Sequence, residues 1–231
     1  MGADNQPKHR RIARDLRRKS AIRNRIERLL IVCEGSKTEP QYIDEIRQDL
    51  RLTTTHIRVI GPGYGTDPLS VVDYAEHLFL NGDRRQNISP REFDRIVTVF
   101  DRDDHEKYYP ALEKILTLEK KLINDEKVKV SIEAVVSVPC FELWLLLHYE
   151  DVYAAIHRYD VYDRLKLHIQ NYDKGQSGLW KVTRPFFDMA SNRAARMANL
   201  TTRYDGVEPY TDMHHFVARL LALKTVVVGI H

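Results

Sequence analysis

The sequence predicts an α/β fold, with a parallel β-sheet flanked by helices and a helical elaboration at its C-terminal end. Short apolar segments alternate with helical patterns over residues 29–148, and only helical patterns follow. Strands that alternate with helices are typical of a parallel sheet with helices on both faces. Of the 231 residues, 43% are hydrophobic, which is enough to build an ordinary core. We therefore expect an α/β core over residues 28–150 and a helical elaboration, residues 151–231, packed on the same sheet.

Four segments have the composition of strands. Residues 29–33 form a continuous apolar run, which is typical of a strand buried on both faces. Residues 95–100 are mainly β-branched and aromatic. The other two predicted strands cover residues 56–60 and 129–138. A helical segment follows each strand, so all four strands are expected to run in the same direction.

The predicted helices begin at capping residues or prolines. Ser36 or Thr38 can cap the first helix, Pro40 suits its first turn, and Pro68 marks the start of the second. The sequence further predicts helices through Leu112 to Leu122 and over residues 141–148, 161–170, 182–199 and 214–223, with loops at 174–178 and 204–211.

Positive charge is concentrated at the N-terminus. The chain has a net charge of +3, yet residues 8–28 contain ten basic and two acidic side chains. A basic arm on a mildly acidic body indicates contact with a polyanion; a solvated tail that aids solubility is the alternative. We expect the arm, residues 1–27, to be flexible until it meets nucleic acid or a partner, with Arg17 and Arg18 as nucleic-acid contacts.

Membrane insertion and export are not expected. No apolar run approaches the roughly 20 residues that cross a bilayer, and the N-terminus lacks the apolar segment of a secretory signal. Cys33 and Cys140 are far apart in apolar surroundings, which favours two reduced core thiols over a disulfide or zinc site. These features predict a cytoplasmic protein.

Acidic residues end two of the predicted strands. Glu34 follows the first strand, and Asp101 and Asp103 follow the third. Functional groups gather at the carboxyl ends of parallel strands, and positions i and i+2 of an extended chain point the same way. If the two strands are neighbours, three carboxylates converge. Glu39, one helical turn beyond Glu34, is a candidate ligand for a second ion, and Gly35 lets a phosphate approach closely.

Converging carboxylates with no obvious cationic partner repel one another, and a divalent cation relieves that repulsion. Oxygen ligands favour Mg²⁺ or Mn²⁺ over zinc. A solvated acidic turn, or a helix cap at Asp103, is the simpler interpretation of the same residues. The role of Glu142 also has two interpretations. It lies either at the first turn of an apolar helix, where the helix N-terminus stabilises it, or in the site.

Two sets of motifs resemble known families. Glu34-Gly35 after the first strand and residues 100–103 after the third resemble the Toprim pattern of topoisomerases, primases and OLD-type nucleases. Residues 31–40, 100–103 and 139–148 are more closely similar to motifs of the RloB family, and the segments at 172–175 and 209–214 fit its later motifs. The resemblance covers most of residues 28–223. RloB-family members are bacterial proteins, often encoded with restriction or ATPase partners, and are linked to phage defence.

The resemblance implies a Toprim-like core that hydrolyses phosphodiesters of RNA or DNA with one or two metal ions. Glu34, Asp101 and Asp103 carry over as metal-binding and catalytic residues. Glu39 matches the glutamate of the Thr-Glu pair in OLD-type nucleases, although its spacing is one residue longer. Glu142 corresponds to a further acid after the fourth strand. An ATPase partner is also implied, and the sequence leaves a homo-oligomer open.

Phosphodiester cleavage also needs cations near the scissile phosphate. Two ions about 4 Å apart activate the nucleophile and neutralise the leaving oxygen, and a lysine or arginine can stabilise the pentavalent oxyanion. Lys174, Lys37 and Arg102 are the candidates, with surface cations as the simpler interpretation. Two further hypotheses are a binding module for an ATPase or nucleic acid with an inactive Toprim core, and nucleotidyl transfer as in primases.

Overall fold

The computed structural model describes residues 27–54, 57–103, 105–200 and 202–228, and in them a five-stranded sheet of order β2-β1-β3-β4-β5. Four strands are parallel, and the short fifth strand runs antiparallel to β4. The sheet confirms the predicted α/β class. Its strands are β1 (Leu29–Cys33), β2 (Ile57–Ile60), β3 (Arg95–Asp101), β4 (Ser131–Val138) and β5 (Tyr210–Thr211).

The register of the parallel strands brings their carboxyl ends together. Cys33 of β1 pairs with Val99 of β3, and Asp101 of β3 pairs with Ser137 of β4. The backbone amide of Glu34 continues the ladder by donating to the carbonyl of Val99 at 2.9 Å. The first and third strands are therefore neighbours, which is the condition that the convergence of their acids required.

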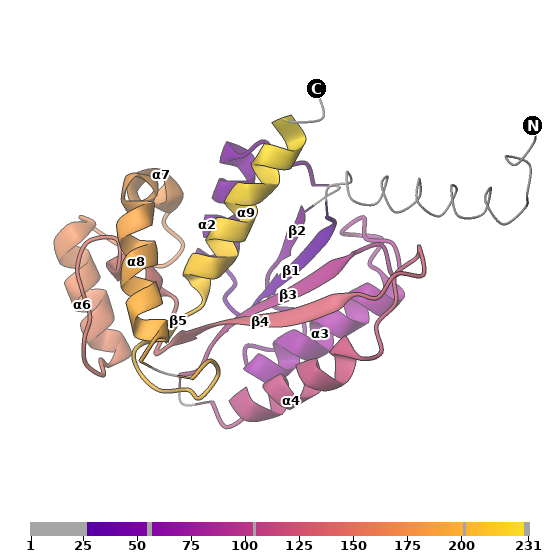
Figure 1. Ribbon diagram of the computed structural model, residues 1–231, viewed down its shortest axis with the longest axis horizontal. Helices are drawn as coiled ribbons and strands as arrows, with labels where there is room; N and C mark the ends of the chain where they lie inside the picture. The colour runs from indigo at the N-terminus through magenta and orange to yellow at the C-terminus, as the bar shows by residue number, and fades with distance from the viewer. Residues whose placement is uncertain (1–26, 55–56, 104, 201, 229–231) are drawn as a thin grey trace, which may run out of the picture.

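Two helices cover one face of the sheet. Figure 1 shows α3 (Pro68–Asn81) and α4 (Tyr108–Glu119) side by side below the strands. Asp67 caps α3 by accepting from the amide of Ser70 at 3.1 Å, and Pro68 occupies the first turn, where no amide donor is required. The apolar sides of both helices join Leu30 and Val32 of β1 in one core cluster.

The other face carries α2 (Thr38–Asp49) and α9 (Met213–Val228), and the remaining helices gather where the parallel strands end (Figure 1). These are α5 (Glu142–Leu146), α6 (Arg158–His168), α7 (Leu179–Thr183), the 3-10 turn η1 (Arg184–Phe186) and α8 (Phe187–Ala198). The buried apolar side chains of the four α-helices form one continuous cluster with those of α2 and α9. The C-terminal helices are thus held against the same end of the sheet as the predicted acids.

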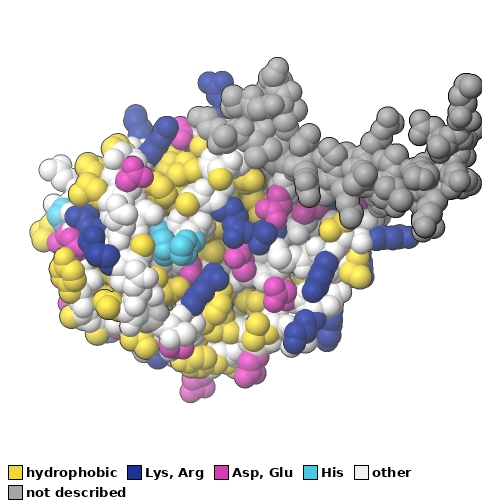
Figure 2. Space-filling model, in the orientation of Figure 1, with side chains coloured by type: hydrophobic (Ala, Val, Ile, Leu, Met, Phe, Trp, Pro, Cys, Tyr) yellow, Lys and Arg dark blue, Asp and Glu magenta, His cyan; other side chains and the backbone are white. Residues whose placement is uncertain are grey.

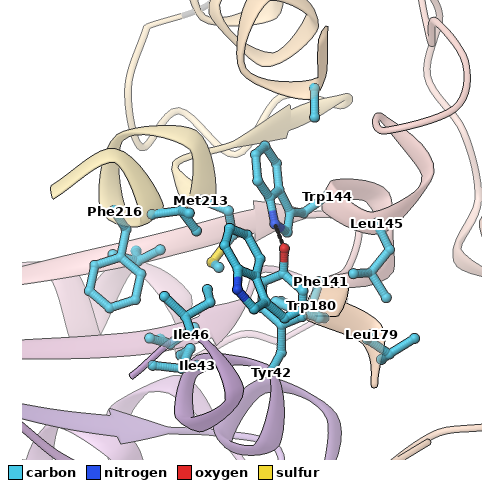
Figure 3. Close-up of a cluster of buried hydrophobic side chains, with 14 of the residues drawn as sticks. Tyr42, Ile43, Ile46, Phe141, Trp144, Leu145, Leu179, Trp180, Met213 and Phe216 are labelled. Atoms are coloured by element: carbon cyan, nitrogen blue, oxygen red, sulfur yellow. Dashed lines mark hydrogen bonds between the residues drawn. The ribbon is translucent and has the colours of Figure 1, made fainter. Parts of the chain in front are cut away.

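Tyr42 of α2 ties this second core together (Figure 3). The indole of Trp144 donates to the Tyr42 hydroxyl at 3.1 Å, and the Thr183 hydroxyl lies 3.2 Å from the same oxygen. Each fully buried side chain such as Ile43 or Phe141 contributes about 2 kcal/mol by leaving water. Three helices distant in sequence are therefore fixed relative to one another beside the pocket described below.

Several sequence-based expectations are corrected by the structure. Strand β5 was predicted as loop, because two residues are too few to show alternation. Thr38 does not cap α2 but is its first residue, and its hydroxyl accepts from the amide of Gly175 at 3.0 Å. The helix predicted over 182–199 is interrupted by η1, where Pro185 lacks an amide proton.

Other expectations concern single residues or the ends of the chain. Cys33 and Cys140 are free and buried, and burial raises the pKa of both thiols well above the usual value. Across the described residues, every helix is too short or too polar to cross a bilayer. The basic arm up to residue 26, with Arg17 and Arg18, lies outside the described residues. Figure 2 shows acidic and basic side chains interspersed on the visible face of the described body.

Candidate functional site

A pocket of about 420 Å³ lies at the carboxyl ends of β1, β3 and β4. Loops and helices from both halves of the chain contribute to it. Its ionisable side chains come from the loops at the strand ends, from α2 and from the C-terminal region. They are Glu34, Lys37, Glu39, Asp101, Asp103, His105, Glu142, Arg158 and Lys174. All five acids that the sequence singled out therefore line one pocket.

Glu34 joins the ends of β1 and β3. One carboxylate oxygen accepts from the amide of Asp101 at 2.9 Å, and the other lies 3.1 Å from Nε2 of His105. Burial raises the pKa of Glu34 to about 7, although the hydrogen bond from Asp101 opposes the shift. The charge of Glu39 raises this pKa further, so Glu34 is held in place at an electrostatic cost.

Asp101 is the last residue of β3 and is surrounded by other acids. Burial raises its pKa well above the usual value, and the charges of Glu39, Glu142 and Glu34 raise it further. A hydrogen bond from the backbone of Phe141 opposes that shift. Like charges that share one site cannot all ionise without a compensating cation. Asp101 is therefore at the centre of the repulsion in the pocket.

Glu39 folds back over Gly35. A Cβ atom built on Gly35 would lie 1.9 Å from Oε2 of Glu39, so this carboxylate occupies the space that any side chain at residue 35 would need. Burial, followed by the charge of Glu142, raises the pKa of Glu39. Gly35, which the sequence analysis linked to close approach of a phosphate, thus leaves room for a glutamate from the first turn of α2.

Asp103 does not continue the strand. Its φ of 38° lies in the left-handed region, so the extended geometry expected for residues 101–103 is wrong. The turn is closed by the amide of His105, which donates to the carbonyl of Arg102 at 3.2 Å, and the amide of Asp103 donates to the carbonyl of Pro139 at 3.3 Å. The carboxylate of Asp103 still faces the pocket, where it forms an ion pair with Arg158.

Glu142 satisfies both alternatives left by the sequence. It opens the five-residue helix α5 and also lines the pocket, where it is buried. Its Oε1 accepts from the hydroxyl of Tyr172 at 3.1 Å and lies 3.8 Å from Nζ of Lys174. The apolar helix thus presents one carboxylate to the site.

The predicted cations lie in different places. Lys37 and Lys174 line the pocket, whereas the guanidinium of Arg102 packs against Gly206. Arg158, which the sequence analysis missed, is a pocket cation from the first turn of α6. That helix was predicted to begin only at residue 161, and one arginine in a polar segment carries no signal of its own. His105 occupies the pocket beside Glu34.

The donors fit a hard divalent cation in their chemistry. They are carboxylate oxygens, and a cation would relieve the repulsion that raises the pKa of Asp101 and Glu34. In their observed rotamers they are directed to other groups, and within the described ranges no three His, Cys, Asp or Glu side chains are arranged to hold an ion. Binding an ion would require these side chains to exchange protein partners for the metal.

The fold and pocket define an α/β protein with an acid-rich site at the carboxyl edge of a mainly parallel sheet. The family model described as RloB-like protein matches residues 29–220, and the chain therefore belongs to the RloB-like family. The match includes every pocket residue and confirms the resemblance seen in the sequence motifs. No curated protein and no solved structure matches the chain at a significant level.

Proposed function

We propose that this protein is a divalent-metal-dependent nuclease that hydrolyses phosphodiester bonds of RNA or DNA with Mg²⁺ or Mn²⁺. We further propose that it acts in the bacterial cytoplasm in defence against phage. The observation that carries the proposal is the crowding of buried carboxylates around Asp101, opposite lysine and arginine side chains. Perturbed acids in a cleft are a feature of catalytic sites.

In this proposal the acidic residues bind the metal ions and the basic residues contact the nucleic acid. Glu34, Asp101 and Asp103 hold one ion, and Glu39 and Glu142 are ligands for a second. Bound ions would supply an activated nucleophile and neutralise charge on the leaving oxygen. Lys174 and Lys37 contact the phosphate, His105 orients Glu34, and Arg102, Arg17 and Arg18 are proposed contacts with more distant parts of the strand.

The substitution Asp101→Asn tests the enzymatic proposal. It removes one charge from the centre of the acid cluster with little change in shape, so cleavage of RNA and DNA in Mn²⁺ should fall to background while the fold is retained. Asp163→Asn is the matched control, because Asp163 is an exposed acid of α6 whose side chain is 79% accessible. Cleavage by Asp101→Asn at the rate of the control would refute the assignment.

A second candidate function is a binding module that recruits an ATPase partner or nucleic acid with an inactive core. The observation in its favour is that Asp103, Glu142 and Glu34 are each engaged by another side chain of the protein. Calorimetric titration with Mn²⁺ beside a nuclease assay separates the two. Metal binding without cleavage, also in the presence of an ATPase partner, would favour the binding module.

Self-association is a further proposal, and light scattering on the purified chain measures it.

A further inference from the structure

Tyr162 of α6 lies between two cations of the pocket. Nη2 of Arg158 lies 3.4 Å from the Tyr162 hydroxyl, and Nζ of Lys174 lies 4.9 Å from the centre of the same ring. Tyr162 itself is half-buried and packs against the core beneath α6. One side chain therefore holds a guanidinium at its polar end and an ammonium over its face.

Each of these cations is also engaged by a carboxylate of the pocket. Arg158 is ion-paired with Asp103, and Nζ of Lys174 lies 3.8 Å from Oε1 of Glu142. Both cations keep contact with solvent, since 29% of the Arg158 side chain and 53% of the Lys174 side chain are accessible. A guanidinium has five N–H donors, so Arg158 retains donors for a ligand beyond its two protein partners.

We infer that Arg158 and Lys174, positioned by Tyr162, form a phosphate subsite that takes one phosphate group of a nucleic-acid strand. The ion pairs with Asp103 and Glu142 compete with that phosphate for the two cations. The inference rests on the proposed function, because it assigns the phosphate-binding wall of the same pocket. A phosphodiester has two non-bridging oxygens, which gives one acceptor to each cation.

The competition couples phosphate binding to the state of the acids. When a divalent cation engages Asp103 and Glu142, these carboxylates no longer hold Arg158 and Lys174, and the phosphate gains both cations. Linkage requires the reciprocal effect, so a bound strand strengthens cation binding by the same factor. Tyr162 is a positioning residue here, because it keeps the two cations in place when the acids release them.

The test measures the binding of a short fluorescein-labelled single-stranded DNA, and of the same RNA sequence, by anisotropy. Titrations are run in EDTA and in Ca²⁺, with the full chain. Arg158→Ala should weaken binding about tenfold and lower the salt slope by about one, because it removes a charge-assisted contact to phosphate. Arg158→Lys should restore the salt slope and part of the affinity.

Two further substitutions address the positioning and the competition. Tyr162→Phe keeps the ring under Lys174 and loses the hydroxyl beside Arg158, so we expect binding to weaken about threefold, less than in Arg158→Ala, because the lost hydrogen bond positions Arg158 and does not itself contact the phosphate. Asp103→Asn should tighten binding of the strand in EDTA, because it frees Arg158. The difference between the affinities measured in EDTA and in Ca²⁺ should therefore be smaller than in the wild type. Tyr159→Phe is the matched control on the exposed side of α6, with affinity unchanged.

Unchanged affinity in Arg158→Ala and in Asp103→Asn, with thermal midpoints like the wild type, would overturn the inference. If Arg158→Ala does not fold, the affinities of Arg158→Lys and Asp103→Asn test the inference. If the affinities of the wild type and the variants follow the expected order but the wild type cleaves no strand, the nuclease proposal fails and the phosphate subsite stands. If the wild type cuts and Arg158→Ala binds normally, only the subsite fails.

Discussion

Two regions of this molecule bury carboxylates in opposite ways. At the edge where β5 pairs with β4, Asp212 is 1% exposed and is satisfied by donors. One oxygen accepts from Nε of Arg203 at 3.0 Å and from the hydroxyl of Tyr210 at 2.7 Å, and the other accepts from the amide of Val136 at 3.4 Å. Burial raises the pKa of Asp212, but all three of these partners oppose the shift.

At the pocket, by contrast, the neighbours of the buried acid are further acids. After burial itself, the groups that raise the pKa of Asp101 are Glu39, Glu142 and Glu34. Asp212 stabilises the edge of the sheet because its charge is matched, whereas Asp101 carries a repulsion that a ligand could relieve. The sign of the neighbouring charges therefore distinguishes the carboxylate that holds the sheet edge from the carboxylate at the centre of the proposed site.

The largest expected effect concerns the matched carboxylate. Asp212→Ala leaves the Tyr210 hydroxyl and the Val136 amide without an acceptor and removes the partner of Arg203, so it should lower the free energy of unfolding by about 4 kcal/mol. Urea denaturation followed by circular dichroism measures it. Asp101→Asn in the pocket should leave stability unchanged or raised. Equal losses in the two variants would show that the regions do not differ.

The next effect is a pH dependence at the same edge. Burial and, to a lesser degree, the charges of His215 and Arg203 lower the pKa of His214 to about 4, while an unfolded histidine titrates near 6.5. Between these values the unfolded chain binds a proton that the folded chain does not. The free energy of unfolding therefore decreases as the pH is lowered. The contribution is fully present above about pH 6.5, and about 3 kcal/mol is lost by about pH 4.

His214→Asn isolates that contribution. Asparagine can still donate to the carbonyl of Thr211, which lies 3.0 Å from Nδ1 of His214, but it does not titrate. The stability difference between wild type and variant should therefore shrink as the pH falls through this window. Urea denaturation at a series of pH values provides the measurement, and a difference independent of pH would contradict the assigned pKa.

The smallest effect concerns the acids crowded around Asp101. At a concentration about one hundred times its dissociation constant, Mn²⁺ bound only by the folded chain stabilises it by about 2.7 kcal/mol. Thermal melting in Mn²⁺ and in EDTA should show this gain in the wild type and in Asp212→Asn, and its loss in Asp101→Asn. A similar gain in all three proteins would indicate that the ion binds outside the pocket.

The fold and the acids of the pocket could be predicted from local patterns. The apolar run at 29–33 and the β-branched run at 95–100 became neighbouring parallel strands, and each ends in an acid that reaches the same pocket. Chain direction and side-chain alternation are local properties, so they can be recognised along the sequence. The motifs around Glu34 and Asp101 were sufficient to recognise the RloB-like family, which the match over residues 29–220 confirms.

The contacts of the cations could not be predicted in this way. Arg158 and Tyr162 lie more than fifty residues beyond Asp103, in a segment whose helix begins earlier than its apolar spacing indicated. The left-handed turn at Asp103 is accompanied by a backbone hydrogen bond from Asp103 to Pro139, the residue that follows β4. Contacts of this kind depend on packing between elements, and local sequence propensity does not predict them.

Local sequence patterns were enough to identify the four parallel strands of the sheet, the acids at the ends of two of them and the family of the chain. These follow from periodicity and residue type, because a buried strand and an acidic strand end require particular side chains wherever they occur. Which cation meets which acid depends on tertiary packing, since α6 packs on α5 beyond the end of the sheet and, with the loop at Lys174, brings Arg158 to Asp103 and Lys174 to Glu142. Charge pairing depends on distances in space, and these distances exist only after the core around Tyr42 and Trp144 has packed.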